Sequence, residues 1–457
     1  MESASFTSGS ITKHLLRFVG PYMLGLLLQN LYGAVDLFVV GNFATTADVS
    51  AVTIGSQIMT MFTQTIIGFA TGTTVLVGQY YGEGNRQKLS QSTGTAMPLF
   101  GTLAVILTAF LLLFNGPIIH AMQTPPEAIA MTRQYLFVCS LGIVFIFSYN
   151  VIASMLMGVG NTKTPFLFVA VACAINIILD LVLVSGFGMG ALGAGIATTI
   201  AQAGSVFFAL LYIKRKGLGF HIERKDVRFH KDLSLKTLKI GGPVALQNAL
   251  VSVSFLFITA IINRLGLNYS AAAGIVEKMV TFLFIPNFAF CAAVATVSAQ
   301  NLGAGKPKRS RQSMWYSCMM AFLPSVCFVV LCQIIPETLA GIFSLDPAVV
   351  ALAAEYLRSY IFDCAAVSFV FCMNGYFNSC GRSWFTLTHS LIATFAVRIP
   401  LSFVLTSLPN PTLFVIGWAA PVSSLVSLVL CLVFLFYLDH RKKIKEDDLL
   451  HPRLDNG

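Results

Sequence analysis

The sequence predicts an all-α polytopic membrane protein with twelve transmembrane helices in two six-helix lobes related by a parallel (6+6) repeat. Of its 457 residues, 56% are hydrophobic and 11% are charged, and the mean hydropathy is +0.78. Soluble proteins carry about 25% charged residues, so a soluble fold is excluded. Each of twelve apolar stretches could cross about 30 Å of hydrocarbon as a helix. The expected spans lie near 15–40, 49–79, 92–115, 129–157, 165–185, 191–213, 241–264, 270–300, 313–335, 349–378, 385–407 and 413–437.

The distribution of basic residues predicts the orientation of these spans. If the N-terminus lies in the cytoplasm and the spans alternate, all but five of the 29 Lys and Arg residues fall in cytoplasmic segments. The outer loops are then neutral or acidic, as the positive-inside rule requires. We therefore expect a multi-pass protein of the cell membrane with both termini in the cytoplasm. Basic loops beside anionic membrane lipid account for the net charge of +10, and no nucleic-acid partner is needed.

An internal repeat divides the chain into two halves. Residues of the segment GQYYGEGN return 221 positions later in AQNLGAGK, and the same offset joins further pairs. Because this offset covers six spans, an even number, both halves have the same orientation in the membrane. The matching residues are Gln79 with Gln300, Gly82 with Gly303, Gly84 with Gly305, Tyr135 with Tyr356, and Gly160 with Gly381.

The repeat predicts four segments. A first six-helix lobe is expected at 1–213 and a second at 241–437, facing each other across a central cavity. A basic cytoplasmic linker, 214–240, joins the lobes, and residues 438–457 are expected to form a cytoplasmic tail. We expect the protein to act as a monomer.

Two aspartates lie inside spans of the first half, Asp36 in span 1 and Asp180 in span 5. A carboxylate in hydrocarbon costs about 2.5 kcal/mol or more, which makes an intramembrane acid a candidate functional group. Both spans run outward, and each aspartate lies about five residues before the outer end, so the two share one depth at ~1.5 Å per residue. Two acids at one depth predict a site that binds H⁺ or Na⁺ and titrates as a coupled unit.

Further polar side chains at this level could complete the pocket. They either share a helix face with one of the aspartates, by spacings of three or four residues, or reach the same depth on span 6. They are Asn176, Tyr32, Gln29, Thr198 and Thr199. The alternative is that each aspartate only accepts hydrogen bonds from a neighbouring helix and holds the bundle together.

The second half carries three charges whose roles the sequence leaves open. Asp363 in span 10 and Arg398 in span 11 could form a structural ion pair or take part in coupling. Glu277 could attract a cationic substrate or anchor the outer end of span 8. In the first half, Pro21 interrupts span 1 and predicts a bend in the helix that carries Asp36.

No motif of an enzyme or of an ATP-driven pump is present. The sequence contains no Walker A motif, no hydrolase signature and no metal-ligand spacing among its Cys and His residues. We therefore expect no catalytic residues, no metal site and no cofactor. An ion gradient is the expected energy source, since one charge crossing 100 mV yields about 2.3 kcal/mol.

Several segments together carry a family resemblance. They are LYGAVDLFVVGNF in span 1, the paired GQYYGEGN and AQNLGAGK, GNTKTPF before span 5, NIILDLVLVSGFGMGALGAGIATT through spans 5 and 6, and RIPL in span 11. With these, the chain resembles prokaryotic multidrug and toxic compound extrusion (MATE) transporters over nearly its full length. The resemblance implies alternating access and H⁺- or Na⁺-coupled antiport of amphipathic, often cationic, organic compounds. It also implies that Asp36, Asn176, Asp180 and Thr198 hold the coupling cation.

Three other classes are open at this point. A lipid-linked saccharide flippase of the same superfamily would need a long basic groove, whereas the spans hold few Arg or Lys residues. A major-facilitator porter would carry a Gly-x-x-x-Asp-Arg-type motif between spans 2 and 3, where this chain has GEGNRQK. A receptor or membrane scaffold would lack both the paired acids and the repeat.

Overall fold

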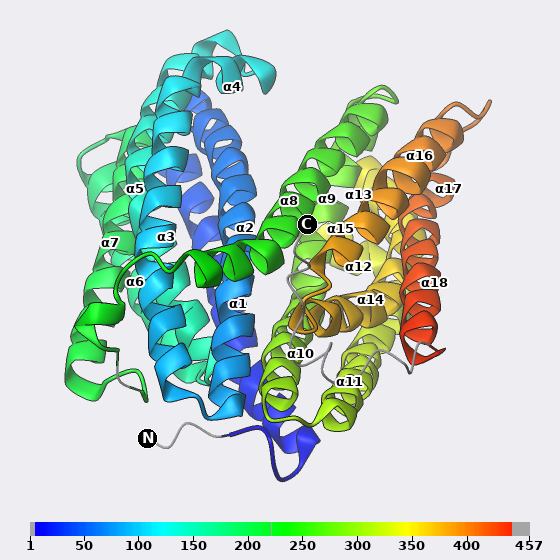
Figure 1. Ribbon diagram of the computed structural model, residues 1–457. Helices are drawn as coiled ribbons and strands as arrows, with labels where there is room; N and C mark the ends of the chain where they lie inside the picture. Colours follow the sequence, from blue (N-terminus) through cyan, green and yellow to red (C-terminus); the bar gives the residue numbers. More distant parts are fainter. Residues whose placement is uncertain (1–4, 221, 441–457) are drawn as a thin grey trace. The chain divides into compact units, whose positions relative to one another are not determined.

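The computed structural model describes residues 5–220 and 222–440, and these form helices without any strand (Figure 1). The helices of the first half are α1 (Ile11–Phe43), α2 (Thr46–Glu83), α3 (Arg86–Leu113), α4 (Asn115–Ala121), η1 (Pro126–Ala128), α5 (Ile129–Gly158), α6 (Lys163–Asp180), η2 (Leu181–Gly186) and α7 (Gly190–Lys216). The later helices are η3 (Arg224–Asp226), α8 (Lys231–Asn263), α9 (Leu267–Leu283), α10 (Ile285–Gly303), α11 (Pro307–Ile334), α12 (Pro336–Gly341), α13 (Pro347–Tyr360), α14 (Phe362–Ser379), α15 (Ser383–Leu391), η4 (Ile392–Arg398), α16 (Ile399–Thr406), α17 (Leu413–Gly417) and α18 (Ala419–His440).

The described helices offer twelve candidate membrane spans when each bent pair counts as one span. Ten are long and apolar enough to cross singly when short helices such as η2 and η4 are joined to their neighbours. Two more are bent pairs, α9 with α10 at 40° and α13 with α14 at 43°. The bend in the first pair lies beside Pro286, which cannot donate a backbone hydrogen bond. The predicted all-α fold of twelve spans is thereby confirmed.

The helices gather into two compact units whose boundaries differ from those of the two halves of the sequence. Unit 1 is mainly residues 20–245, and unit 2 contains residues 6–19 and the chain from Leu246 onward. Helix α1 therefore begins in unit 2 and continues in unit 1, while α8 does the reverse. In both helices the change of unit lies beside a Gly-Pro pair, Gly20-Pro21 in α1 and Gly242-Pro243 in α8.

The four predicted segments, 1–213, 214–240, 241–437 and 438–457, follow the sequence repeat, and their boundaries differ from those of the two units. The linker at 214–240 packs entirely within unit 1, and the first residues of the second lobe stay with it there. The tail at 438–457 lies outside the described residues except for 438–440, which end α18. The segment boundaries therefore stay predictions about the repeat.

Glycines in α2 fasten the beginning of α8 within unit 1. A Cβ atom on Gly68 would overlap the backbone of Ala245, and one on Gly72 would overlap the carbonyl oxygen of Thr237. Small residues four apart let two helix backbones approach closely, which is how membrane helices associate without a hydrophobic drive from water. The two glycines therefore fix where α8 crosses α2.

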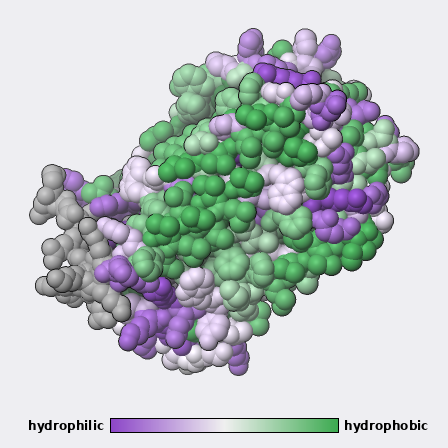
Figure 2. All heavy atoms as spheres, turned by 90° about the vertical axis from the view of Figure 1, so that its right-hand side faces the viewer, coloured by the Kyte–Doolittle hydropathy of each residue, from purple (hydrophilic) through white to green (hydrophobic). Residues whose placement is uncertain are grey.

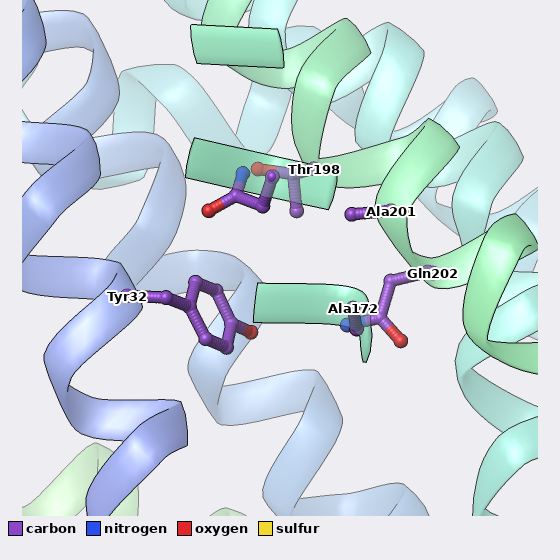
Figure 3. Close-up of a pocket in the computed structure, with 6 residues that line it drawn as sticks. Tyr32, Ala172, Thr198, Ala201 and Gln202 are labelled. Atoms are coloured by element: carbon purple, nitrogen blue, oxygen red, sulfur yellow. The ribbon is translucent and has the colours of Figure 1, made fainter. Parts of the chain in front are cut away.

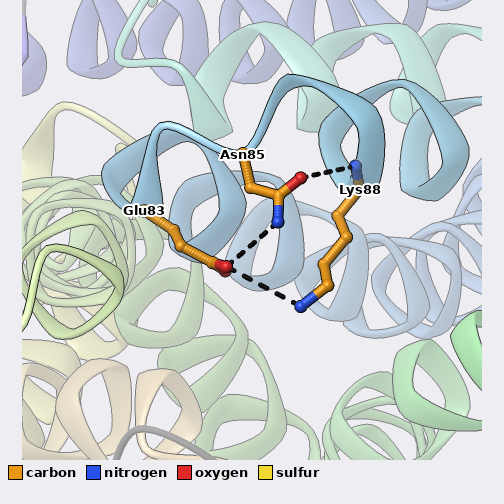
Figure 4. A network of polar contacts seen from close by, with 3 residues as sticks. All are labelled: Glu83, Asn85 and Lys88. Atoms are coloured by element: carbon orange, nitrogen blue, oxygen red, sulfur yellow. Dashed lines mark hydrogen bonds and ion pairs between the residues drawn. The ribbon is translucent and has the colours of Figure 1, made fainter.

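The turn between α2 and α3 shows why the repeated motif needs its residues. Gly84 ends α2 in the left-handed region at φ 72°, which glycine adopts without strain, and its repeat partner Gly305 does so at φ 69°. The Asn85 side chain accepts from the Lys88 backbone N–H at 3.0 Å and donates to Glu83 at 3.1 Å (Figure 4). This cap starts α3 immediately after α2 ends.

A connection between α2 and α7 within unit 1 is held by Asp48. Thr45 and Asp48 form a reciprocal cap at the start of α2, in which the Thr45 hydroxyl donates to the carboxylate at 2.6 Å. The other carboxylate oxygen accepts the backbone N–H of Ala191 at 2.9 Å, which ties the start of α7 to the start of α2. Gly190 has φ +53° and faces this carboxylate so closely that a Cβ would overlap it.

The N-terminal segment belongs to unit 2. Phe6 is fully buried, and its backbone N–H donates to the Gln300 side chain at 3.1 Å. Its carbonyl oxygen accepts from Asn301 and Arg309, and the Arg309 guanidinium also donates to the carbonyls of Ser8 and Gly9. The repeat motif in α10 thus holds the chain just before α1 begins.

Much of the surface is apolar. Figure 2 shows a broad hydrophobic zone on the face turned to the viewer, with hydrophilic residues gathered towards its edges. Large hydrophobic side chains are exposed along α16 and α18, among them Phe403, Val404, Val429, Val433 and Phe436. Such a surface suits lipid chains rather than water.

Candidate cation-binding site

Three helices of unit 1 position the predicted site residues. Asp36 is on α1, Asn176 and Asp180 are on α6, and Thr198 is on α7. Asn176 and Asp180 are four residues apart, so both project from one face of α6. Asp180 is the last residue of α6, and the π-helix η2 follows directly. Single π-helical turns inside α-helices are frequent at functional sites because they redirect side chains and free backbone groups.

The structure brings these four residues together. The Thr198 hydroxyl donates to Asp36 Oδ2 at 3.4 Å. The Asp36 carboxyl group also lies in direct contact with the side chains of Asp180 and Asn176. Asp36 is 6% exposed and Asp180 is fully buried. The span-1 and span-5 acids expected at one level therefore lie next to each other, and their role as an ion site stays a prediction.

The site has more polar atoms than internal partners. Within the described part of the chain, no hydrogen bond satisfies Asp36 Oδ1, either carboxyl oxygen of Asp180, or either polar atom of the Asn176 amide. None of the ion pairs among the described residues involves Asp36 or Asp180. Two buried carboxyl groups without a basic partner are costly as a pair of anions, so the arrangement favours a bound proton or cation.

A small pocket opens beside these groups. It is lined by Tyr32, Ala172, Asn176, Thr198, Ala201 and Gln202, from α1, α6 and α7. Figure 3 shows the Tyr32 ring reaching from α1 towards the middle of the pocket, with Thr198, Ala201 and Gln202 on the other side. Tyr32 and Gln202 both line this pocket with polar groups. The pocket itself is lined by amide and hydroxyl groups, and the Asp36 carboxyl group lies beside it through its contact with Thr198.

Sequence reasoning missed Gln202 as a pocket residue. The spacing signal was present, because Gln202 follows Thr198 by four residues on α7 and so shares its face. Ala172 stands in the same relation to Asn176 on α6, and its small side chain leaves room for the Tyr32 ring. Alanine has no polar side-chain atom, so a search of the sequence for polar residues does not identify the pocket alanines.

The remaining first-half residues lie outside the pocket. The Thr199 hydroxyl donates to the Val138 carbonyl oxygen of α5 at 3.2 Å, so it faces away from its neighbour Thr198. Gln29 is half-buried on α1 and does not line the pocket. Pro21 is also half-buried, and α1 runs through it as one continuous helix.

In unit 2, Arg398 does not form the direct ion pair considered for it with Asp363. Its guanidinium donates to the Tyr360 hydroxyl at 2.5 Å and lies 4.6 Å from the centre of the Phe255 ring. Cation–π contact and a hydroxyl acceptor hold the Arg398 side chain in this position. Asp363 is buried, and one of its oxygens has no hydrogen bond among the described residues. Glu277 accepts from the Thr259 hydroxyl at 3.2 Å.

Comparison with known proteins decides the family. The MatE family profile matches residues 21–182 and again 243–404, once in each half of the chain. The chain belongs to the MATE family of transporters. The two matches begin at Pro21 and Pro243, so each covers one copy of the repeat.

Among relatives of this MATE protein is the probable multidrug resistance protein YpnP of Bacillus subtilis, 26% identical over 88% of this chain and 90% of YpnP. The multidrug export protein MepA of Staphylococcus saprophyticus is 22% identical over 97% of this chain and 98% of MepA. The fold is also that of a MATE crystal structure in complex with MaL6, at a TM-score of 0.91 over 97% of this chain and all of the other, with 18% identity.

Proposed function

We propose that this MATE transporter is a secondary active antiporter that exports amphipathic or cationic organic compounds across the cell membrane in exchange for H⁺ or Na⁺. The observation that carries the proposal is the contact of two buried acids, Asp36 and Asp180, with no basic partner and with unsatisfied oxygen atoms. Relatives named for multidrug export and resistance support the class of substrate. They do not favour a lipid-linked saccharide flippase.

The proposed coupling follows from which helices the ion joins. A proton or Na⁺ bound between Asp36 and Asp180 neutralises their repulsion and holds the outer part of α1 against α6 and α7. Without an ion, the two carboxylates repel and this docking of α1 is weaker. Helix α1 begins in unit 2 and continues in unit 1. Ion occupancy therefore shifts the conformational equilibrium of the helix that joins the two units. A bend at Pro21, beside the change of unit, is the proposed point of flexing.

Further parts of the proposal concern the surroundings of the protein. We propose that it lies in the cytoplasmic membrane with both termini in the cytoplasm, surrounded by membrane lipid, and acts as a monomer on small organic molecules. It needs no cofactor beyond the coupling ion, and it catalyses no chemical reaction. Asn176 and Thr198 act as neutral ligands of the ion, and Tyr32 and Gln202 line its pocket.

Ethidium efflux from loaded proteoliposomes under imposed pH or Na⁺ gradients tests the antiport. Wild-type protein should export ethidium only with a gradient of one of these ions. Asp36→Asn and Asp180→Asn should each remove the dependence on the gradient, whereas Glu127→Gln, at an exposed acid, should not. Efflux that ignores both gradients would contradict antiport, and normal coupling in both aspartate variants would contradict this site.

A further inference from the structure

The linker between the two halves of the chain carries an outward surface that none of the described residues covers. Its exposed basic residues include Arg224, Arg228 and Lys231, and the exposed acids Glu223, which pairs with Lys225, and Asp232 lie beside them. Three large apolar side chains lie among them, with Val227 44%, Phe229 57% and Leu235 52% exposed. We call these three basic and three apolar residues the linker surface. Basic and apolar side chains mixed on one exposed face are typical of segments that lie in the interface of a bilayer.

Buried contacts of the linker force these residues outward. Asp226 is buried, and its carboxylate accepts from the Ser90 hydroxyl of α3 at 2.6 Å. His230 is hydrogen-bonded to Thr95 of α3 at 2.8 Å. With residues 226 and 230 pinned to α3, the segment between them can only turn its side chains away from the protein. The linker surface is therefore held in place by unit 1 rather than free in solution.

Helix α8 continues the same face. Leu233, Thr237 and Ile240 are buried against unit 1 at helical spacing. Lys231 and Leu235 are four residues apart on the opposite, exposed face. The first turns of α8 are thus amphipathic, with an outer face that mixes positive charge and apolar surface.

The depth of the linker can be measured along α2 and α3. A Cβ on Gly94 would overlap the Asp226 carbonyl oxygen, and Gly94 lies about 12 Å from the start of α3 at 1.5 Å per residue. By the same measure, Gly72, which contacts Thr237, lies about 16 Å from the end of α2. The α2–α3 turn, which contains Glu83, Asn85 and Lys88 (Figure 4), therefore lies about 12–16 Å from the linker along the axes of α2 and α3.

This depth places the linker surface in the bilayer interface. The headgroup layer of one leaflet is about 5–8 Å thick. If the charged α2–α3 turn lies in water, a surface about 12–16 Å further in along these helices lies at the headgroups or at the start of the hydrocarbon. Phe229 in water would be an unfavourable exposed apolar group, whereas at this level it would lie against acyl chains.

We propose that the linker surface binds anionic phospholipid, with Arg224, Arg228 and Lys231 contacting the headgroup phosphates and Phe229 and Leu235 lying among the acyl chains. The site lies in the inner leaflet, a placement that rests on the proposed orientation of the chain. The basic residues select anionic over neutral lipids, because each basic residue near an anionic surface raises the affinity about fivefold. Neutral lipids fill the same place more weakly.

Native mass spectrometry of the purified full-length protein tests the proposal. Delipidated protein in neutral detergent is titrated with phosphatidylglycerol or phosphatidylcholine, and bound lipids are counted. Wild-type protein should prefer phosphatidylglycerol, and the preference should weaken at high salt. Arg224→Gln with Lys231→Gln should weaken phosphatidylglycerol binding roughly thirtyfold and leave phosphatidylcholine binding unchanged. Phe229→Ser should weaken the binding of both lipids.

The matched control is Arg86→Gln with Lys88→Gln, which removes two exposed charges from the α2–α3 turn beyond the headgroups. This control should keep the lipid preference. An equal loss in both double variants would mean that only overall charge matters and would overturn the site. Full binding by the linker variant would also overturn it and would assign these charges to another partner, such as an acidic soluble protein. Should the first variant fail to fold, Arg228→Gln with Lys231→Gln replaces it. No readout uses transport, so failure here leaves the antiport proposal standing.

Discussion

The backbone N–H of Phe6 donates to the side-chain oxygen of Gln300 at 3.1 Å, although 294 positions separate the two residues. Gln300 belongs to the repeated motif in α10, and Phe6 lies just before α1 begins. The contact attaches the N-terminal segment to unit 2, while the rest of α1 from Gly20 belongs to unit 1. A helix shared in this way is held at both ends, by Gln300 near its start and by the Asp36 contacts near its C-terminal end.

Phe6→Ala should destabilise the protein by about 3–5 kcal/mol, the usual cost of removing a fully buried phenylalanine. The midpoint of thermal unfolding in detergent measures it. Leu16→Ala is the matched control, because it truncates a side chain of α1 that is 56% exposed and should change the midpoint little. Equal shifts in the two variants would mean that the N-terminal segment is not anchored by Phe6.

Gly190→Ala should lower the unfolding midpoint much more than Gly188→Ala. Both glycines have positive φ, +53° and +65°, so alanine strains the backbone at either position by about 1–3 kcal/mol. Only at Gly190 would the added Cβ also meet the Asp48 carboxylate that ties α7 to α2. Similar decreases in the unfolding midpoint for the two variants would show that backbone strain alone accounts for the destabilisation. Adding Asp48→Ala to Gly190→Ala should remove part of the difference.

Thr198→Val should weaken binding of the coupling ion about fivefold, as expected for the loss of one hydroxyl ligand worth about 1 kcal/mol. The ion concentration for half-maximal ethidium efflux measures this. Thr199→Val is the matched control next along the chain, since its hydroxyl bonds to the Val138 carbonyl outside the site. A larger shift for Thr199→Val than for Thr198→Val would contradict the assignment of Thr198 as a ligand.

Arg398→Gln should destabilise unit 2 more than Tyr360→Phe does. Both remove the hydrogen bond between these side chains, worth about 1.5–3 kcal/mol to a charged donor. Arg398→Gln additionally removes the cation from the Phe255 ring and from the neighbourhood of buried Asp363. Thermal unfolding separates the two variants, and Arg398→Lys should fall between wild type and Arg398→Gln. Identical midpoints for Tyr360→Phe and Arg398→Gln would mean that the charge contributes nothing.

The candidate site was predictable in part. Asp36 and Asp180 stand out because charged groups are rare in apolar spans, and Asn176 follows from the spacing of a helix. The choice of Thr198 over Thr199 for the site is visible only in three dimensions, since the two are adjacent and lie at nearly the same depth. The rotation of α7 decides which of them faces Asp36, and packing against α5 sets that rotation.

Hydropathy was enough to determine the twelve spans, because a bilayer imposes length and polarity on each segment separately, and the quoted sequence segments were enough for the family resemblance. The tertiary structure alone decided that α1 and α8 each pass between units, that Gln202 lines the pocket, and that Arg398 turns to Tyr360 instead of pairing with Asp363. These features depend on how helices distant in sequence pack against one another. Hydropathy and spacing report each helix by itself and do not contain that information.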